Sequence, residues 1–428
     1  MNQFSRVTLA VGITLMACSP ASAQFRPERP YRGIFASGVD NSTHSVVGNG
    51  TLSAGYDDDL LADATGRDQP VSNQQGILGQ VSGGLSYTLN VDRVSLNAGA
   101  GSTVRYYPSL EREYFTTHNA GVNASARILN RPEVSLFGSA NYQPVNFLSA
   151  FPALDNSLTL ENPEPDFVPV ESQYVAYAAG VSISQPLSRR MSVSASGTRR
   201  MADRLETDFW SQSANAALRV QMTRDVALRL GYAVSEAHYE GRPTVVSHRP
   251  DIGLDFARAL SLTRRTSLSF GVGTDATVSS GETRWRASGH VQLAHEIGRS
   301  WVTRAAYQRG TRFIETITEP VFSDSVQASL SGLLTRRIQF TSIASASIGS
   351  AGSNSRQFDS YRGSAGLSVA LTRYMNTGVD YAYYRYLMDP LIALPSGVPS
   401  NVNRQSIRGH ISLWVPVLNR PRRANASR

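Results

Sequence analysis

The chain has 428 residues, of which 41% are hydrophobic, and it carries a formal net charge of +8 at pH 7. Its apolar runs all fall short of the roughly 20 residues that a membrane-spanning helix needs, which excludes a helical membrane protein. The basic residues are all arginines, and they are scattered over predicted turns and strand faces rather than gathered on a helix. That distribution argues against nucleic acid as a partner.

Residues 1–23 have the pattern of a secretory signal peptide. Arg6 supplies the positive charge, residues 7–17 form an apolar core too short to span a membrane, and residues 21–23, Ala-Ser-Ala, form a cleavage site. Cys18 is the only cysteine and lies in this segment, so the mature chain is expected to have no disulfide bond. The residues before Cys18 also resemble a lipoprotein box, which leaves lipidation as an alternative.

A recurring unit of two strands joined by a tight turn containing arginine organises most of the chain. Residues 259–270, ALSLTRRTSLSF, show it, because alternating apolar and polar residues lead into and out of Arg264 and Arg265. From residue 190 onward such turns fall about 34 to 40 residues apart, which indicates a repeat architecture. The similar turns contain Arg131, Arg189, Arg224, Arg299, Arg336 and Arg373. One tight turn and one more variable loop per repeat are typical of a transmembrane β-barrel of up-and-down hairpins.

Period-two alternation is clearest in residues 94–106. Val94, Leu96, Ala98, Ala100, Val104 and Tyr106 share one face, and Ser95, Asn97, Gly99, Gly101, Thr103 and Arg105 share the other. The polar face is repeatedly Ser, Thr, Asn, Gly and Arg over whole strands, while the apolar face mixes small with large side chains. This mixture suits lipid contact better than a packed core, which disfavours the soluble alternatives, a β-propeller or a β-helix.

The predicted fold is all-β, a transmembrane antiparallel up-and-down β-barrel of about 18 strands. The strands are expected to begin near residues 48, 77, 94, 114, 134, 173, 191, 209, 226, 245, 266, 283, 300, 322, 338, 358, 375 and 404. An even count puts both ends of the barrel on one side, with short arginine turns in the periplasm and longer loops, 148–172 and 388–402, outside the cell. Residues 24–43 would be a periplasmic lead-in, 44–418 the barrel and 419–428 a basic C-terminal tail.

Aromatic residues cluster near the predicted outer ends of the strands, where they are expected to form a girdle at the membrane interface. They are Tyr106, Tyr107, Tyr114, Phe115, Tyr142, Phe147, Tyr174, Tyr383, Tyr384 and Tyr386.

The first and last strands carry short motifs, GYDDDL at residues 55–60 and SLWVP at residues 412–416. Together with the signal peptide and the successive hairpins, they resemble the β-barrel porin 2 group of bacterial outer-membrane proteins. The resemblance implies an outer-membrane barrel of largely undefined activity, whose relatives often accompany surface-polysaccharide genes. The chain departs from the usual pattern at its C-terminus. Such barrels usually end on an aromatic residue, whereas residues 419–428 follow the last strand here.

The strongest functional signal is a set of arginines on the polar face of the predicted strands. Charged rings inside a pore set ion selectivity, and arginine favours anions. The face carries few acids, of which Asp251, Asp255 and Asp275 are the candidates. The candidate pore-lining arginines are Arg105, Arg127, Arg219, Arg229, Arg284, Arg286, Arg304, Arg312, Arg362 and Arg408.

The predicted loop 148–172 is acidic, with Asp155, Glu161, Glu164 and Asp166 as its candidate functional residues. It could fold into the lumen as a constriction loop and face the arginines. The alternative is a surface loop that its charge keeps soluble.

Other candidate chemistry is weak. Asp57, Asp58, Asp59 and Asp63 are acidic enough for a cation, but their spacing does not match an EF-hand loop, and a solvated strand end explains them as well. His290 and His295 are five residues apart on one strand and therefore face opposite sides, which argues against a shared metal. The sequence has no Gly-x-Ser-x-Gly motif, so no enzyme, metal or cofactor is predicted.

The sequence therefore predicts a porin-like channel in the bacterial outer membrane that passes anionic or polar solutes, with surface-polysaccharide export as a further role. The alternative is a non-conducting barrel that serves structurally or as a binding partner in envelope or polysaccharide assembly. The expected partners are outer-membrane lipid and lipopolysaccharide, the barrel-assembly machinery, and polysaccharide or anionic solutes.

Overall fold

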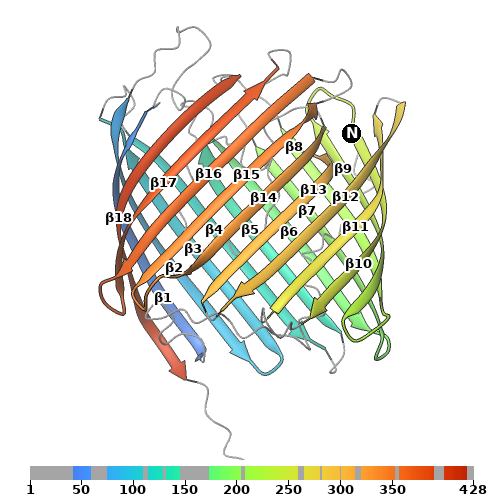
Figure 1. Ribbon diagram of the computed structural model, residues 1–428, viewed down its shortest axis with the longest axis horizontal. Coiled ribbons are helices and arrows are strands. Elements are labelled where there is room, and N and C mark those ends of the chain that lie inside the picture. The colour runs from blue at the N-terminus through green and yellow to red at the C-terminus, as the bar shows by residue number, and fades with distance from the viewer. Residues whose placement is uncertain are drawn as a thin grey trace, which may run out of the picture.

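A closed antiparallel β-barrel makes up the part of the chain that the computed structural model describes (Figure 1). The described residues are 42–58, 75–108, 114–128, 132–144, 173–203, 208–258, 265–279, 282–298, 300–313, 320–351, 356–389 and 400–421. Within them, no helix is long and apolar enough to cross a membrane.

Eighteen strands follow one another up and down around the barrel, as predicted. Their bounds are β1 (Ser42–Asp57), β2 (Gly76–Val91), β3 (Val94–Tyr106), β4 (Tyr114–Arg127), β5 (Glu133–Pro144), β6 (Gln173–Pro186), β7 (Met191–Asp203), β8 (Phe209–Gln221), β9 (Val226–Tyr239), β10 (Val245–Arg258), β11 (Arg265–Ser279), β12 (Glu282–Ile297), β13 (Trp301–Arg312), β14 (Val321–Leu333), β15 (Ile338–Ala351), β16 (Arg356–Ala370), β17 (Met375–Met388) and β18 (Asn401–Pro421). Apart from β1, every strand begins within about three residues of its predicted start, because turn residues mark those boundaries locally.

The barrel closes where β18 pairs with β1. This pairing continues through Ser45 opposite Asn419 to Ser42 opposite Pro421. The strands therefore occupy 42–421 rather than the expected 44–418, and residues 419–421, assigned to the tail, belong to β18. Residues 419–421 continue the last strand because they pair with the first residues of β1. That partner is far away in the sequence, so the residues near 419 do not reveal it.

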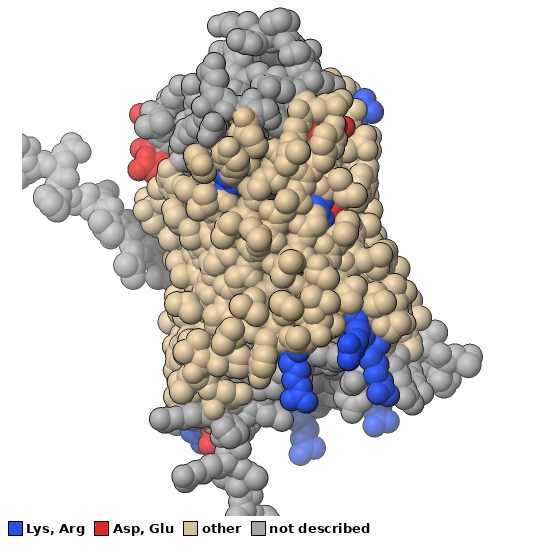
Figure 2. Space-filling view, turned by 90° about the vertical axis from the view of Figure 1, so that its left-hand side faces the viewer, with Lys and Arg blue, Asp and Glu red and all other residues tan. Residues whose placement is uncertain are grey.

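The two faces of the wall differ in exposure as the alternation predicts. In β18, Ile407 and Ile411 are 49% and 50% exposed, whereas Arg404 and Arg408 are 3% and 7% exposed. Apolar side chains thus point outward and polar ones inward. Figure 2 shows the consequence on one side of the barrel, where a broad band holds few charged side chains, while basic side chains project beyond its lower margin. The outward face matches the apolar belt of a transmembrane barrel.

Four tight turns at the lower end in Figure 1 are built alike. In each, a Ser or Thr side-chain oxygen accepts backbone N–H groups two or three residues later, for example Thr223 from Asp225 at 3.3 Å and from Val226 at 3.1 Å. The corresponding residues of the other turns are Ser188, Thr335 and Thr372. Such local side-chain bonds favour a turn over continued strand, so the motif Ser/Thr-Arg fixes the hairpin. The turn at 259–264 lies outside the described residues.

These tight turns are expected to face the periplasm, because short turns take that side in outer-membrane barrels. An epitope tag inserted at Arg224 or Arg336 should stay unlabelled on intact cells and become labelled after permeabilisation. A tag at Gly241, in the connection between β9 and β10 at the opposite end, should be labelled on intact cells. Labelling at Arg224 with none at Gly241 would reverse the orientation.

Candidate functional site

All ten predicted arginines lie on the inward face of the barrel. Arg229, Arg286 and Arg408 each lie next to an exposed outward residue, namely Leu230 (43%), Trp285 (69%) and Ile407 (49%). The other seven are placed on the same face by alternation and cross-strand register: Arg105, Arg127, Arg219, Arg284, Arg304, Arg312 and Arg362. Arg127 lies at the tight-turn end of β4, where it is exposed.

The sequence analysis missed Arg200, which alternation places inside because its neighbour Met201 is 46% exposed on the outward face of β7, and it missed two further inward arginines. Arg249 lies in β10 between His248 and Pro250, where the apolar alternation is weak. Arg404 coincides with the predicted start of the last strand, although β18 already begins at Asn401. In both cases the residue sits where the local pattern is least regular, and its face follows only from pairing with a neighbouring strand.

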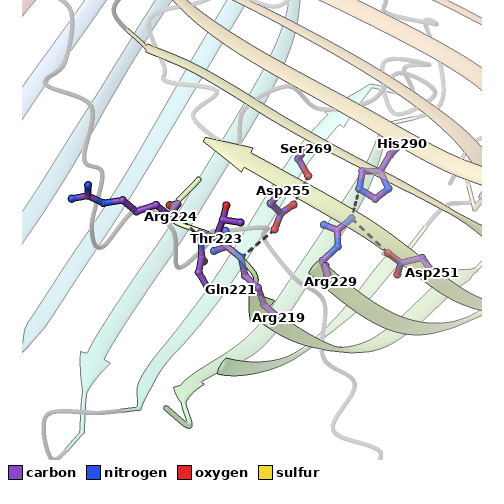
Figure 3. Close-up of polar contacts among 9 residues, drawn as sticks. All are labelled: Arg219, Gln221, Thr223, Arg224, Arg229, Asp251, Asp255, Ser269 and His290. Carbon is purple, nitrogen blue, oxygen red and sulfur yellow. Dashed lines mark hydrogen bonds and ion pairs between the residues drawn. The ribbon is translucent and has the colours of Figure 1, made fainter. Parts of the chain in front are cut away.

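On the inner wall, Arg219 of β8 and Arg229 of β9 point toward two carboxylates of β10 (Figure 3). The Arg219 Nε atom lies 3.3 Å from Asp255 Oδ2, and Asp255 also accepts the Ser269 hydroxyl at 2.8 Å. Arg229 Nη2 lies 3.6 Å from Asp251 Oδ2 and 2.5 Å from His290 Nε2. Because a guanidinium can only donate, His290 Nε2 accepts this bond. The wall is therefore a connected polar surface rather than a row of isolated charges.

Glycines let these side chains lie against the wall. A Cβ atom on Gly231 would overlap the Asp251 carboxylate. One on Gly253 or Gly271 would lie 2.9 Å from Arg229 Nη2, a spacing that real Cβ atoms do not show. The inward glycines of the sequence pattern thus make room for the charged groups and keep them close to the strands.

Asp275, nearer the loop end of β11, is fully buried and accepts several hydrogen bonds. Its carboxylate accepts the Ser247 hydroxyl at 2.6 Å and the Thr311 backbone N–H at 2.8 Å, and Arg249 Nε lies 3.8 Å away. The three acids expected on the inner face, at 251, 255 and 275, are each ion-paired with an arginine. Part of the positive charge of the wall is therefore offset locally.

The inner face nevertheless keeps an excess of positive charge. The ten predicted arginines, with Arg249 and Arg404, outnumber the carboxylates that alternation places on the same face. These carboxylates are Asp57, Glu133, Asp251, Asp255, Asp275, Glu282, Glu296 and Asp380. A low-dielectric wall around a polar interior concentrates such a field.

Asp57 is part of an ion pair that joins the first and last strands, and it is not solvated as the sequence suggested. Its two carboxylate oxygens accept Arg404 Nε at 2.9 and 2.8 Å, and Oδ2 also accepts Nη2 at 2.6 Å. The side chains are 0% and 4% exposed. Asp58 beside it accepts the Gln405 backbone N–H at 2.6 Å, while residues 59 and 63 lie outside the described part. Within that part, no group of three or more His, Cys, Asp or Glu side chains could hold a metal.

Three histidines contact polar side chains of neighbouring strands, and the sequence did not predict these contacts. His410 Nδ1 lies 2.8 Å from Asp380 Oδ2 on the inner face. His290 contacts Arg229 inside, whereas His295 contacts the Thr266 hydroxyl at 2.8 Å. Alternation puts His290 and His295 on opposite faces of β12, as predicted.

The predicted aromatic girdle is wrong for four of its members. Tyr106 and Tyr114 point outward, with 37% and 58% exposure, but their neighbours Tyr107 and Phe115 point inward. Tyr384 and Tyr386 are also buried inside. Consecutive residues of a strand face opposite sides, so adjacent aromatics cannot all meet lipid.

These inward aromatics belong to an inner collar of apolar side chains near the loop ends of the strands. Tyr107 and Phe115 pack edge to face with their ring centroids 5.5 Å apart, and the Phe209 and Tyr239 centroids are 4.9 Å apart. All members of the collar are at most 3% exposed, so this level of the interior is packed around them. The collar consists of Leu78, Tyr107, Phe115, Phe209, Tyr239, Phe358, Tyr384 and Met388.

The predicted constriction-loop residues, Asp155, Glu161, Glu164 and Asp166, lie outside the described residues. Their role stays a prediction.

Comparison with known proteins finds similarity among solved structures. No protein-family model and no curated protein matches the chain. It is similar to OpdQ (TM-score 0.45) and to OccK2 (OpdF) in complex with glucuronate (TM-score 0.47), both from Pseudomonas aeruginosa, each 9% identical over 88% of this chain and 98% of theirs. A BenF-like porin from Pseudomonas fluorescens Pf-5 is also 9% identical, over 87% of this chain and 99% of its own, with a TM-score of 0.45. Likeness at this identity concerns the fold alone.

The localisation follows from the barrel itself. In lipid, backbone polar groups must be satisfied internally, which a closed barrel achieves. An antiparallel barrel with an apolar belt outside and a polar wall inside is the spanning architecture of bacterial outer membranes. The chain is therefore an 18-stranded outer-membrane β-barrel of porin-like architecture.

Proposed function

We propose that the protein is an outer-membrane channel for small anionic or polar solutes. The observation that carries this proposal is the placement of arginine: all ten predicted arginines, with Arg200, Arg249 and Arg404, share the inward face, while only a smaller number, such as Arg199, Arg309 and Arg385, point outward in the described strands. An 18-stranded barrel is wide enough to enclose an aqueous lumen. Arginine keeps its charge at any working pH, so an excess of it gives that lumen a positive potential that attracts anions.

Channel selectivity tests the proposal directly. In planar bilayers under a KCl gradient, the wild-type protein should prefer chloride to potassium. Replacing Arg219 and Arg229 with serine removes two inward charges and leaves Asp255 and Asp251 without their ion-pair partners. The chloride-to-potassium permeability ratio should therefore fall several-fold. The preference should also weaken with salt, because the Debye length falls from about 10 Å at 0.1 M to about 3 Å at 1 M.

Matched variants separate lumen charge from total charge. Arg199 and Arg385 are exposed on the outward face, so their double serine variant should keep the wild-type permeability ratio. Lysine at positions 219 and 229 should largely keep it as well. A cation preference in the wild type, or equal shifts in the inward and outward serine variants, would mean that another lining governs the pore.

The inner collar favours a second candidate, a barrel that does not conduct. Its buried side chains line the inner wall near the loop ends, and such an apolar lining also suits a barrel that serves structurally or as a binding partner in envelope assembly. Single-channel recordings separate the two, because a non-conducting barrel gives no current steps at any voltage.

We further propose that the chain belongs to the β-barrel porin 2 group and that its solutes include surface polysaccharide or its anionic building blocks. This finer assignment rests on the short motifs of the first and last strands and on the basic inner wall, which would attract acidic sugars. Binding of uronic-acid oligosaccharides, but not neutral ones of equal length, in a current-block assay is the expected result. The wall supports binding and selectivity rather than catalysis, so we propose no enzymatic role.

A further inference from the structure

The barrel wall divides between β12 and β13 in the half nearer the loops. Pairing of these two strands ends at Gly289 opposite Arg309. β12 continues for residues 282–288, still paired with β11, and β13 continues for residues 310–312, still paired with β14. We call these two segments the β12–β13 seam.

Polar contacts fix this divergence in place. The Thr311 N–H donates to Asp275 on the inner side of β11 at 2.8 Å, and Arg249 Nη2 donates to the Thr311 carbonyl at 3.3 Å. The Thr311 and Thr277 hydroxyls also lie 3.2 Å apart. The end of β13 is thereby held toward the lumen, while the end of β12 stays with β11. The seam is a built feature of the wall.

Two guanidinium groups meet at one aromatic ring in the seam. The Arg286 Cζ atom, from the inward face of β12, lies 4.6 Å from the Phe322 ring centroid. The Arg309 Cζ atom, from the outward face of β13, lies 5.4 Å from the same centroid. Arg309 is 45% exposed in its side chain, and Trp285 on the other lip is 69% exposed. The seam therefore presents positive charge and an apolar indole to the outside.

Anions suit this place better than cations. Asp324 pairs with Arg309 at 3.4 Å and accepts the Tyr307 hydroxyl at 2.5 Å, while Asp275 is engaged by β10 and β13. Around the seam, arginines outnumber carboxylates: Arg249, Arg284, Arg286, Arg309 and Arg312 stand against Asp275, Glu282 and Asp324. Converging arginines suit phosphate, which they can bind in a bidentate manner.

The position of the seam selects the source of the phosphate. It lies near the loop ends of β12 and β13, which under the orientation proposed above is the depth of the outer-leaflet headgroups. Exposed Trp285 is a side chain typical of that interface. We propose that the β12–β13 seam binds the phosphate of a phosphorylated outer-leaflet lipid, with Arg286 and Arg309 contacting the phosphate and Trp285 contacting the lipid's headgroup.

Lipid binding to the purified, folded barrel tests this. Native mass spectrometry with lipid A should show a retained phosphorylated lipid on the wild type, and the dephosphorylated form should bind at least tenfold more weakly. Replacing Arg286 and Arg309 with glutamine should weaken lipid A binding at least tenfold, since each substitution removes a charge-assisted hydrogen bond to the phosphate. Glutamine at Arg199 and Arg385, exposed outward arginines on other strands, should leave it unchanged.

Two further experiments show whether the bound phosphate belongs to a lipid or is free, and they avoid relying on variants that could misfold. An excess of inorganic phosphate should not displace lipid A, because free phosphate cannot make the headgroup contact with Trp285; displacement would assign the seam to free anions and overturn the proposal. A photo-crosslinking residue at Trp285 leaves both arginines in place and should label lipid A. Labelling of other bilayer lipids alone, or equal binding by both double variants, would also overturn it. None of these measurements depends on conductance. The lipid-binding proposal can therefore stand or fall independently of the channel proposal.

Discussion

Replacing Asp57 with alanine is expected to destabilise the barrel by about 3–5 kcal/mol, because it leaves a buried arginine without its counterion. Arg404 donates three bonds to this carboxylate, and both side chains are almost completely buried. The pair joins β1 to β18, so its loss also weakens the pairing of the first and last strands that closes the barrel. The midpoint of urea unfolding in lipid bilayers measures the effect.

Two matched variants show whether the buried charge is the cause. Alanine at Asp58, which accepts one backbone N–H from Gln405, should cost about 1 kcal/mol. Replacing Asp57 with leucine and Arg404 with methionine together should restore most of the lost stability, because apolar pairs of similar volume often replace buried ion pairs without cost. A single Asp57 variant as stable as the wild type would show that the closure does not depend on this pair.

Arginine at Val291 is expected to impair folding into bilayers by about 2–4 kcal/mol, whereas arginine at the adjacent Gln292 should have little effect. Val291 is 40% exposed on the outward face near the middle of β12, so an arginine there meets the lipid interior. Gln292 lies at the same depth but points inward, where it is exposed among polar groups. Comparing neighbours on one strand keeps the depth and the backbone constant.

Folded yield in vesicles of increasing lipid concentration measures this difference. Ser288 is a poor inward control despite its polar character, because it is only 6% exposed and an arginine there would clash. Equal loss at Val291 and Gln292 would contradict the outward and inward assignment of β12.

The sequence by itself determined the strands, their starts and the face of most side chains. The reason is that these properties are local. Alternation has a period of two along a strand, so Leu230 outside implies Arg229 inside without knowledge of any neighbour. The turns are equally local, because Thr223 bonds to the backbone of residues 225 and 226. The same locality explains why the ten arginines could be placed on one face in advance.

Tertiary structure alone decided which charges meet. Asp57 and Arg404 are 347 residues apart, and only closure of the barrel brings them together. The aromatic girdle was mistaken because a cluster in the sequence says nothing about faces until each residue is assigned its place in the alternation. At the β12–β13 seam, Arg286 and Arg309 both reach Phe322 because β12 and β13 stop pairing at Gly289, and alternation within one strand does not reveal where its neighbour diverges.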